Sequence, residues 1–307
     1  MRLYGNGLVT NENNQVLLIR RNDLRTWAPP GGAIEAQEMP PAGAAREVEE
    51  ETGIKVHPVR LVEMQFRPES PTGILIFVFR CIQRGGQIAP SAESPQVGFF
   101  PATDLPRPML NVHRAMLANG LNHAGGRPHW NSIRLPTGVR LARQFLFGFW
   151  DLRDRMQGKE PFLPPVSWQV GAFCILRNPA GEVLWVRRGD GRVWNLPGGG
   201  PEGIEPPWET TLRETNEETG LTVRLTGCPG IYVRRSRNQI RFTFTAEVTG
   251  GTLTLNPEAT AFGYFAPGAE PPHALPAHVK RVADAVASTN SAAAIGQDQT
   301  LFQEELD

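Results

Sequence analysis

The sequence is poor in lysine and cysteine and lacks a long apolar run. Only three of its 31 cationic residues are lysines (Lys55, Lys159 and Lys280), a bias that indicates an arginine-rich genome rather than a function. The three cysteines lie far apart, which argues against a disulfide framework or a cysteine zinc knuckle. The longest apolar run, 73–79, is far below the ~20 residues that a membrane-spanning helix needs. These absences predict a soluble cytoplasmic protein without disulfides.

Neither sign of charge is in excess. Lysine plus arginine and aspartate plus glutamate each number 31, so the net charge is zero. This balance weighs against a general nucleic-acid-binding protein and against a protein held on membranes by basic charge. With 40% apolar and 20% charged residues, the 307-residue chain has the composition of a globular protein long enough for two domains. We expect neither a nucleic acid nor a membrane as its partner.

A long internal repeat divides the chain. Residues 17–32, LLIRRNDLRTWAPPGG, recur as residues 184–199, LWVRRGDGRVWNLPGG, without a gap. Further on, Phe-x-Phe, Gly-Gly and Gly-aromatic-Phe elements of residues 77–100 recur in residues 242–265. A period this long indicates a duplicated domain rather than a solenoid repeat.

Both copies alternate β-rich runs with helical segments, which predicts an α/β layered fold. The main helix is expected from Pro40-Pro41 to Thr52 in copy one and from Pro206-Pro207 to Thr219 in copy two, because proline starts and glycine ends many helices. Shorter helices are expected near 112–117 and 279–287. The predicted organisation is a first domain over 1–130, a helical connector over 131–165, a second domain over 166–287 and a disordered or loosely docked tail over 288–307.

The connector carries one apolar helix face. Leu141, Phe145, Phe149, Leu152 and Met156 recur at steps of three and four residues. No basic face accompanies them, so a helix that packs against one or both domains is favoured over a membrane-surface helix.

Three glutamates on the main helix of each copy share one face. They are spaced i, i+3 and i+4: Glu47, Glu50 and Glu51, and Glu214, Glu217 and Glu218. Clustered like charges destabilise a helix unless something neutralises them, and hard oxygen ligands suit Mg²⁺ or Mn²⁺. A solvated acidic face is the simpler interpretation of one such pair. With Gly32, Glu38, Arg46 and Gly53 in copy one, and Gly199, Glu205, Arg213 and Gly220 in copy two, the glutamates make up seven positions whose spacing recurs in both copies. One such set of seven arises by chance on the order of 10⁻⁸ per window, so its recurrence favours a metal site instead.

The seven positions resemble the signature of the Nudix hydrolase family, Gly-x5-Glu-x7-Arg-Glu-U-x-Glu-Glu-x-Gly-U, where U is a bulky apolar residue. Both copies match every charged and glycine position, and the only departure is Thr215 at the first U of copy two. The resemblance implies two α/β/α sandwich domains, each a mixed sheet with helices on both faces, joined by the helical connector.

The resemblance also assigns roles to individual residues. The implied metal ligands are the six helix glutamates and the loop carbonyls of Gly32 and Gly199. The implied catalytic carboxylates, which include candidates for the general base, are Glu50, Glu51, Glu93, Glu217, Glu218 and Glu258. The implied structural ion pairs are Glu38 with Arg46 and Glu205 with Arg213. For Glu93 and Glu258 the alternative stays open that they are loop glutamates without a role in catalysis.

Other residues before the loop are candidates for substrate contact. Strand alternation allows only one arginine of each pair, Arg20-Arg21 and Arg187-Arg188, to face the site, where it would hold a phosphate. Trp27 and Trp194 are candidates for stacking a base, with core packing the favoured alternative.

The resemblance implies a divalent-metal-dependent pyrophosphohydrolase. Its small-molecule substrate would be a nucleoside diphosphate linked to another moiety, cleaved by metal-activated water. Two alternatives stay open: a ligand-sensing protein without turnover, and one catalytic domain with the other as a substrate clamp or pseudo-dimer partner. The sequence does not identify the substrate.

Overall fold

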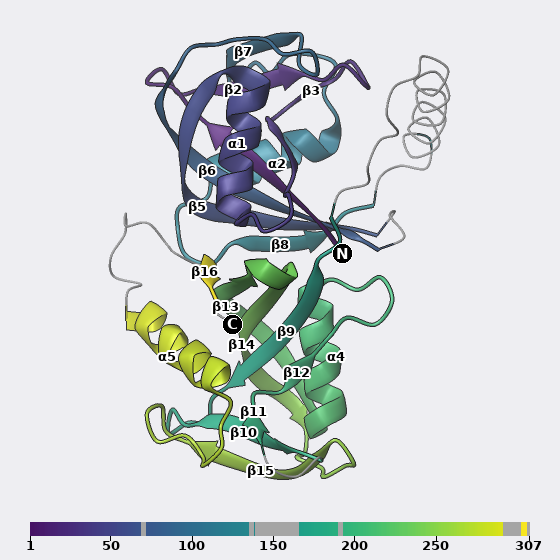
Figure 1. Ribbon diagram of the computed structural model, residues 1–307, viewed down its shortest axis with the longest axis vertical. Helices are drawn as coiled ribbons and strands as arrows, with labels where there is room; N and C mark the ends of the chain where they lie inside the picture. Colours follow the sequence, from purple (N-terminus) through teal and green to yellow (C-terminus); the bar gives the residue numbers. More distant parts are fainter. Residues whose placement is uncertain (69–71, 135–137, 139–165, 190–192, 291–301, 306–307) are drawn as a thin grey trace. The chain divides into compact units, whose positions relative to one another are not determined.

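The computed structural model describes the chain except for residues 69–71, 135–137, 139–165, 190–192, 291–301 and 306–307. Its internal contacts divide it into two units, Met1–Ser167 (unit 1) and Trp168–Asp307 (unit 2), which Figure 1 draws in purple-to-teal and teal-to-yellow. All three cysteines are free and buried. No helix of the described residues is long and apolar enough to cross a membrane.

Unit 1 is a mixed sheet between two helices, with a smaller sheet beside it. Its elements are β1 (Arg2–Val9), β2 (Gln15–Arg20), β3 (Trp27–Ala28), β4 (Gly31–Ala33), α1 (Pro40–Thr52), β5 (Ile54–Arg67), β6 (Ile74–Gly86), β7 (Gln96–Pro101), α2 (Asn111–Leu121) and β8 (His129–Ser132). The main sheet has the order β4-β1-β6-β5-β8, in which β1 pairs with β6, and β5 with β8, in parallel. The smaller sheet, β3-β2-β7, is antiparallel.

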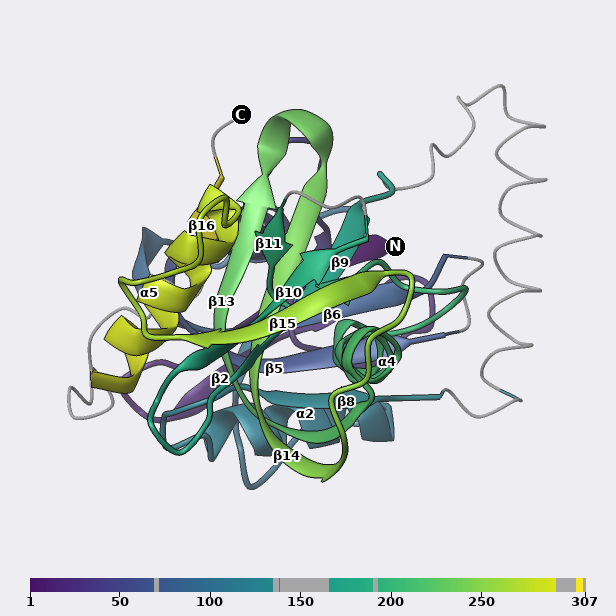
Figure 2. The ribbon, with the colours of Figure 1, turned by 90° about the horizontal axis from the view of Figure 1, so that it is seen from below.

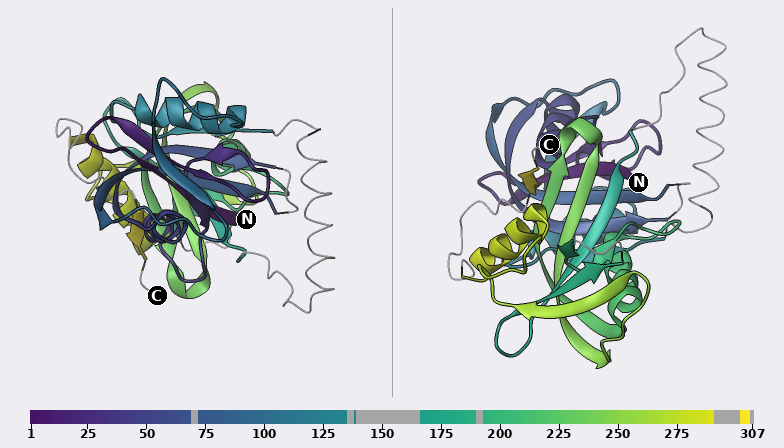
Figure 3. Two further views of the ribbon diagram at one scale, coloured as in Figure 1. Left: turned by 90° about the horizontal axis from the view of Figure 1, so that it is seen from above. Right: turned by 60° about the horizontal axis from the view of Figure 1, so that its bottom comes forward.

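Unit 2 repeats this architecture. Its elements are β9 (Gln169–Leu176), β10 (Val183–Arg188), β11 (Trp194–Asn195), β12 (Gly198–Gly199), α4 (Pro207–Thr219), β13 (Leu221–Arg234), η1 (Arg235–Arg237), β14 (Gln239–Gly251), β15 (Ala259–Phe265), α5 (Pro276–Asn290) and β16 (Phe302–Glu304). The sheets have the orders β12-β9-β14-β13-β16 and β11-β10-β15. Helix α4, seen end-on in Figure 2, packs against β9 and β13, and α5 lies along β13 in the right view of Figure 3.

The helices of unit 1 cover opposite faces of its main sheet. Successive residues of a strand point to opposite faces, so two neighbouring residues of β1 contact different helices. On β1, Gly7 faces α1, and a Cβ there would lie only 2.5 Å from Cγ2 of Val48. The next residue, Leu8, faces α2, where a Cβ on Gly120 would overlap its side chain. This alternation confirms the predicted α/β/α sandwich.

The main helices begin and end where proline and glycine predict. Helix α1 starts at Pro40 and is followed by Gly53 at φ 74°, whose N–H donates to the carbonyl of Glu49 at 2.8 Å. In α4 the corresponding cap is Gly220 at φ 76°. Only glycine adopts this left-handed conformation without strain, so the helix stops directly after its glutamates. The shorter helices run further than predicted, over Asn111–Leu121 and Pro276–Asn290.

The chain around the predicted connector and tail contains two edge strands. Strand β8 carries the sheet of unit 1 through Ser132, two residues into the predicted connector, whose apolar helix face lies outside the described residues. Strand β16 lies within the segment predicted to be disordered or loosely docked, and it pairs in parallel with β13. The small, polar composition of the tail does not predict this strand, because its pairing depends on the partner strand rather than on the segment itself.

Candidate active site

The glutamates of α1 differ in their environment. Glu51 is only 7% exposed, and its Oε2 accepts a hydrogen bond of 2.7 Å from the backbone N–H of Gly31, the first residue of β4. We call the segment from β4 to α1, and that from β12 to α4, the glycine loop of its unit. Glu50 is exposed, and Glu47 is partly buried. In α4 the buried member is Glu218, whose Oε2 accepts from the N–H of Gly198 at 2.9 Å. The i, i+4 spacing therefore directs one carboxylate of each helix back onto the glycine loop.

The glycine of each signature lies directly beneath the first glutamate of the cluster. A Cβ on Gly32 would overlap the carboxylate of Glu47. A Cβ on Gly199 would lie 2.6 Å from Oε1 of Glu214. These positions have ordinary backbone angles, so a side chain here would displace the carboxylate of the helix glutamate rather than strain the backbone.

One arginine per copy binds the loop to the helix. Arg46 donates through Nε and Nη2 to the two oxygens of Glu38, both at 3.0 Å, and through Nη2 to the carbonyl of Ala33 at 2.9 Å. Its Nη1 also donates to Glu47 at 3.0 Å and to Glu50 at 2.9 Å. The predicted pair is thus one part of a network that also orients two helix glutamates, which the sequence spacing did not reveal.

Unit 2 repeats the network with Arg213. Its Nε and Nη2 donate to Glu205 at 3.2 and 3.0 Å, and its Nη1 donates to Glu214 at 3.1 Å and Glu217 at 2.8 Å. Such a bidentate, charge-assisted pair fixes the loop geometry more strongly than a single surface ion pair does.

Burial makes the glutamates of both clusters harder to ionise, and the nearby N–H groups and arginines offset this only in part. It raises the pKa of Glu51 to about 7, and the N–H of Gly31 and the charge of Arg21 offset only part of this rise. Burial likewise raises the pKa of Glu218 to about 7. The pKa values of Glu47 and Glu214 are also raised by burial, although an adjacent arginine lowers each. A bound cation would therefore favour ionisation of the buried glutamates in both sites.

The loop glutamates lie near the same clusters. The charge of Glu93 helps to raise the pKa values of Glu47 and Glu51, and the charge of Glu258 acts likewise on Glu214 and Glu218. Each occupies an exposed loop before the last strand of the smaller sheet.

Asn256 fixes the second of these loops to α4. Its Nδ2 donates to the carbonyls of Glu217 and Glu218 at 2.9 and 3.0 Å, and its Oδ1 accepts from the N–H of Glu258. Asn256 was not among the residues predicted from the sequence. Its position two residues before a candidate glutamate, in an Asn-Pro-Glu turn, is the only signal that the sequence offers.

The second arginine of each pair lies nearer the cluster. Arg20 is directed to Gln96 and the carbonyl of Arg25. Arg21 holds Asp23 at 2.9 and 2.7 Å and interacts electrostatically with Glu51 and Glu93.

The same division holds in unit 2. Arg187 lies over the ring of Trp194 at 6.0 Å, while Arg188 lines a cavity and its charge lowers the pKa of Glu218. The tryptophans pack in the cores, Trp27 edge-on to Phe100 and Trp194 edge-on to Phe265.

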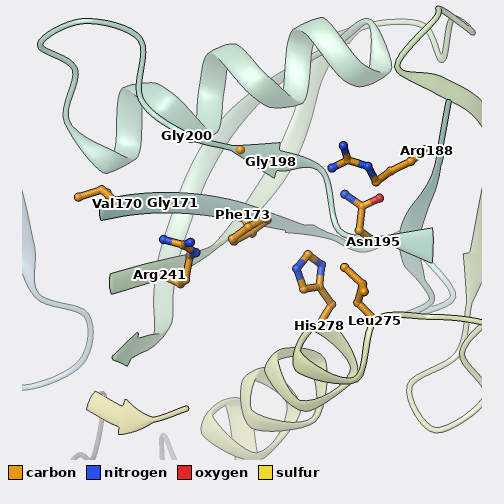
Figure 4. Close-up of a pocket in the computed structure, with 11 residues that line it drawn as sticks. Val170, Gly171, Phe173, Arg188, Asn195, Gly198, Gly200, Arg241, Leu275 and His278 are labelled. Atoms are coloured by element: carbon orange, nitrogen blue, oxygen red, sulfur yellow. The ribbon is translucent and has the colours of Figure 1, made fainter. Parts of the chain in front are cut away.

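Unit 2 has a cavity of about 300 Å³ beside its glycine loop (Figure 4). Its lining includes Gly198–Gly200, Arg188, Phe173, Asn195, Arg241 and His278. Nδ1 of His278 accepts a hydrogen bond from the N–H of Leu196 at 2.8 Å, and burial lowers its pKa well below the usual range. The ring is therefore neutral with its proton on Nε2. The strand residues of this cavity were not predicted, because their convergence depends on strand register.

In the described part of the chain, no three His, Cys, Asp or Glu side chains are already arranged as a metal-binding group. Arg46 and Arg213 draw one carboxylate oxygen of each neighbouring glutamate toward themselves. The donor set remains the one that Mg²⁺ and Mn²⁺ prefer, since it consists of carboxylate and carbonyl oxygens. Glu50 and Glu217, being exposed, are the members freest to reorient toward a cation.

Comparison with known proteins places both halves in one family. A model of the NUDIX domain matches residues 6–120 and 167–285. A MutT-like protein of Streptomyces ambofaciens is 39% identical over 126 residues, which cover 41% of this chain and 79% of that protein. A candidate 8-oxo-dGTP diphosphatase of Bacillus subtilis (strain 168) is 32% identical over 115 residues, covering 37% and 77%.

Solved structures include similar chains. The crystal structure of the mMutator MutT protein from Bacillus halodurans is 23% identical, with a TM-score of 0.40, and covers 45% of this chain and 92% of that one. The family model matches well over half of the chain, in two segments that correspond to the internal repeat. The chain therefore belongs to the Nudix hydrolase family, with one Nudix domain in each half.

Proposed function

We propose that this chain is a divalent-metal-dependent pyrophosphohydrolase with two competent sites. Its substrate would be a nucleoside diphosphate linked to another moiety, such as a nucleotide, a sugar or an ADP-ribose type group, cleaved at the diphosphate bond by water. The observation that carries the proposal is the buried carboxylate of each helix, Glu51 and Glu218, held by a loop N–H beside further carboxylates.

The residues proposed to hold Mg²⁺ or Mn²⁺ are the three glutamates of each helix and the carbonyls of the loop glycines: Glu47, Glu50, Glu51 and Gly32 in unit 1, and Glu214, Glu217, Glu218 and Gly199 in unit 2. Hard oxygen donors and the only partly compensated burial of Glu51 and Glu218 support this set. When bound, such an ion neutralises the charge of the diphosphate and lowers the pKa of a coordinated water.

Other side chains would bind and activate the reactants. Arg21 and Arg188, whose charges reach the buried glutamates, are suited to hold a phosphate oxygen. A carboxylate of the cluster or the neighbouring Glu93 or Glu258 would accept the proton of the attacking water. The ion pairs of Arg46 and Arg213 would keep the helix carboxylates in position. No covalent intermediate is needed.

The experiment that tests this function is nucleoside-monophosphate and phosphate release over a substrate panel. The panel contains ADP-ribose, nucleotide sugars, dinucleoside polyphosphates, and normal and oxidised nucleoside triphosphates, with Mg²⁺, Mn²⁺ or EDTA. We expect metal-dependent turnover of at least one compound by the parent and no turnover by the Glu51→Gln/Glu218→Gln double variant. Metal-dependent binding of a nucleotide without turnover of any compound would instead favour a ligand sensor.

A further inference from the structure

The two units differ in the residues beside their glycine loops. Strand register aligns these residues, since Phe173 pairs with Gly198 as Asn6 pairs with Gly31. In the same way, Arg241 pairs with Gly171 where Ile76 pairs with Tyr4. Where unit 2 has Gly171, Phe173, Asn195 and Arg241, unit 1 has Tyr4, Asn6, Ala28 and Ile76.

These differences change the chemistry of the surface. In unit 1 the amide of Asn6 is directed to the loop, with Nδ2 at 3.3 Å from the carbonyl of Pro29 and 3.4 Å from that of Pro30. Tyr4 packs against the apolar cluster beneath α2. In unit 2 the glycine at 171 leaves room for Arg241, since a Cβ there would lie 2.8 Å from its Cδ. The position of aliphatic Ile76 in unit 1 is thus occupied by the cationic Arg241 in unit 2.

Arg241 lies in a region of positive charge. Its Nη1 donates to the carbonyls of Gln169 at 3.2 Å and Ile240 at 3.4 Å, but the ion pairs in the described part of unit 2 do not include it. Burial and the neighbouring charge of Arg281 lower its pKa, and the charge of Glu305 offsets only part of this effect. Arg281 itself is 3% exposed and is bound at 2.6 Å by Glu305, which follows β16. An anion at this end of the cavity would therefore be attracted.

The other end of the cavity adjoins the carboxylate cluster. Arg188 lines the cavity and interacts electrostatically with Glu218, so the cavity and the cluster form one site. Figure 4 shows Arg188 and Arg241 on opposite sides of Phe173. Between them, Asn195 is 2% exposed, and among the described residues its Oδ1 has no hydrogen-bond partner. His278 supplies a neutral Nε2–H. Phe173 is partly buried, with the guanidinium of Arg281 over its ring at 4.7 Å. The lining thus combines hydrogen-bonding groups with a cation at each end.

We propose that the cavity of unit 2 selects substrates with an anionic group, a phosphate or a carboxylate, on the moiety that occupies the cavity, and that Arg241 binds this group. Unit 1, with Ile76 at that position, does not make this selection. The two halves would then act on different members of one substrate class. The inference rests on the proposed function, because it takes the adjoining carboxylate cluster as the site of diphosphate cleavage.

The test compares compounds that differ in one distal charge. UDP-glucose and UDP-glucuronate differ by a carboxylate, and NADH and NADPH differ by a phosphate. Calorimetric binding to the full chain is measured with Mg²⁺ for each compound, and turnover is measured in a Glu51→Gln background, in which only unit 2 retains its buried glutamate. Four proteins are compared: the parent, Arg241→Ile, which installs the residue of unit 1, Arg241→Lys, which keeps the charge, and Arg224→Ile. Arg224 is an exposed arginine paired with Glu247, so its replacement controls for loss of one positive charge.

The parent is expected to prefer the charged member of at least one pair by about 10- to 100-fold, the range of one charge-assisted hydrogen bond. Arg241→Ile should abolish the preference, Arg241→Lys should retain most of it, and Arg224→Ile should leave it unchanged. The pair that shows the preference identifies the group as a phosphate or a carboxylate. Equal affinity within both pairs, or a preference that survives in a folded Arg241→Ile variant, would overturn the inference. Selective binding without turnover would overturn only the proposed function.

Discussion

Oε2 of Glu51 accepts a hydrogen bond of 2.7 Å from the backbone N–H of Gly31, twenty residues earlier in the chain. Glu218 repeats this relationship with Gly198 at 2.9 Å. The bond fixes the carboxylate against the loop, but burial still raises the pKa of each glutamate to about 7. Each unit therefore keeps a carboxylate that is unfavourable to ionise in the metal-free fold, which is the cost that a bound cation would relieve.

Replacing the buried glutamates by glutamine should stabilise the metal-free chain while removing activity. A pKa raised from 4.5 to about 7 corresponds to about 3 kcal/mol at pH 8, as an upper limit. Between these two values the folded state binds more protons than the unfolded state, so stability falls as the pH rises and the full cost is present above pH 7. Glu51→Gln should thus raise the free energy of unfolding by about 1–3 kcal/mol at pH 8 and change it little at pH 4.5.

Urea unfolding in EDTA at the two pH values checks this expectation, with Glu49→Gln, an exposed glutamate of the same helix, as the control. A Glu51→Gln variant that is less stable than the parent at pH 8 would show that the ionised carboxylate contributes net stability.

Divalent cations should stabilise the chain through the same residues. Ligand in 100-fold excess over its Kd stabilises the folded state by about 2.7 kcal/mol. The rise in melting temperature with Mg²⁺ or Mn²⁺ should be large at pH 8 and smaller at pH 5, where the buried glutamates are protonated. Scanning calorimetry of the parent and of the Glu51→Gln/Glu218→Gln variant tests this, and an equal shift in both proteins would place the cation elsewhere.

A side chain at either glycine beneath the first glutamates, Gly32 or Gly199, should lower the catalytic rate of that unit. In Gly32→Ala the new Cβ would overlap the carboxylate of Glu47, and in Gly199→Ala it would displace that of Glu214. A displacement of about 1 Å in a catalytic group costs on the order of 100-fold in rate. Gly85→Ala and Gly250→Ala are matched controls. Among the residues that the structure describes, a Cβ at Gly85 meets nothing within 4 Å, and one at Gly250 meets only Thr222, at 3.9 Å.

The kcat of each glycine variant, measured in a chain whose other unit is inactivated, reports the effect. Full activity in Gly32→Ala or Gly199→Ala would mean that the observed carboxylate positions are not those of the reaction.

The arginine networks should be sensitive to a change that preserves charge. Arg46→Lys keeps one positive charge but cannot make the two parallel bonds to Glu38 while also holding Glu47 and Glu50. Loss of such supporting contacts to metal ligands costs about 10- to 100-fold in activity or metal affinity. Arg224→Lys, at an exposed pair, should change neither. Metal titration by calorimetry separates a loss of metal affinity from a loss of rate. An Arg46→Lys variant with unchanged metal affinity and rate would show that neither depends on the network.

Local rules predicted much of this structure. Proline and glycine placed the ends of α1 and α4, and the i, i+3, i+4 spacing put three glutamates on one helix face. Strand alternation predicted that only one arginine of each pair can face the site. It did not predict which arginine interacts electrostatically with the buried glutamate, because that depends on where β2 and β10 end.

Features that depend on distant pairing were missed. Arg241 and Phe173 meet the glycine loop only through the register of β14, β9 and β12. Strand β16 exists because β13 presents an open edge, which no property of residues 302–304 reveals. Asn256 acts through its hydrogen bonds to the end of α4, nearly forty residues away in the chain.

The most direct test of the central claim, that both carboxylate clusters are hydrolytic sites, is product release by the two single variants. Parent, Glu51→Gln, Glu218→Gln and the double variant are assayed with Mg²⁺ on every substrate that the parent cleaves. We predict that each single variant loses part of the total activity, or its activity on some substrates, and that only the double variant loses all activity. If one single variant abolishes every activity while the other retains all of them, the chain has one working site and the claim is contradicted.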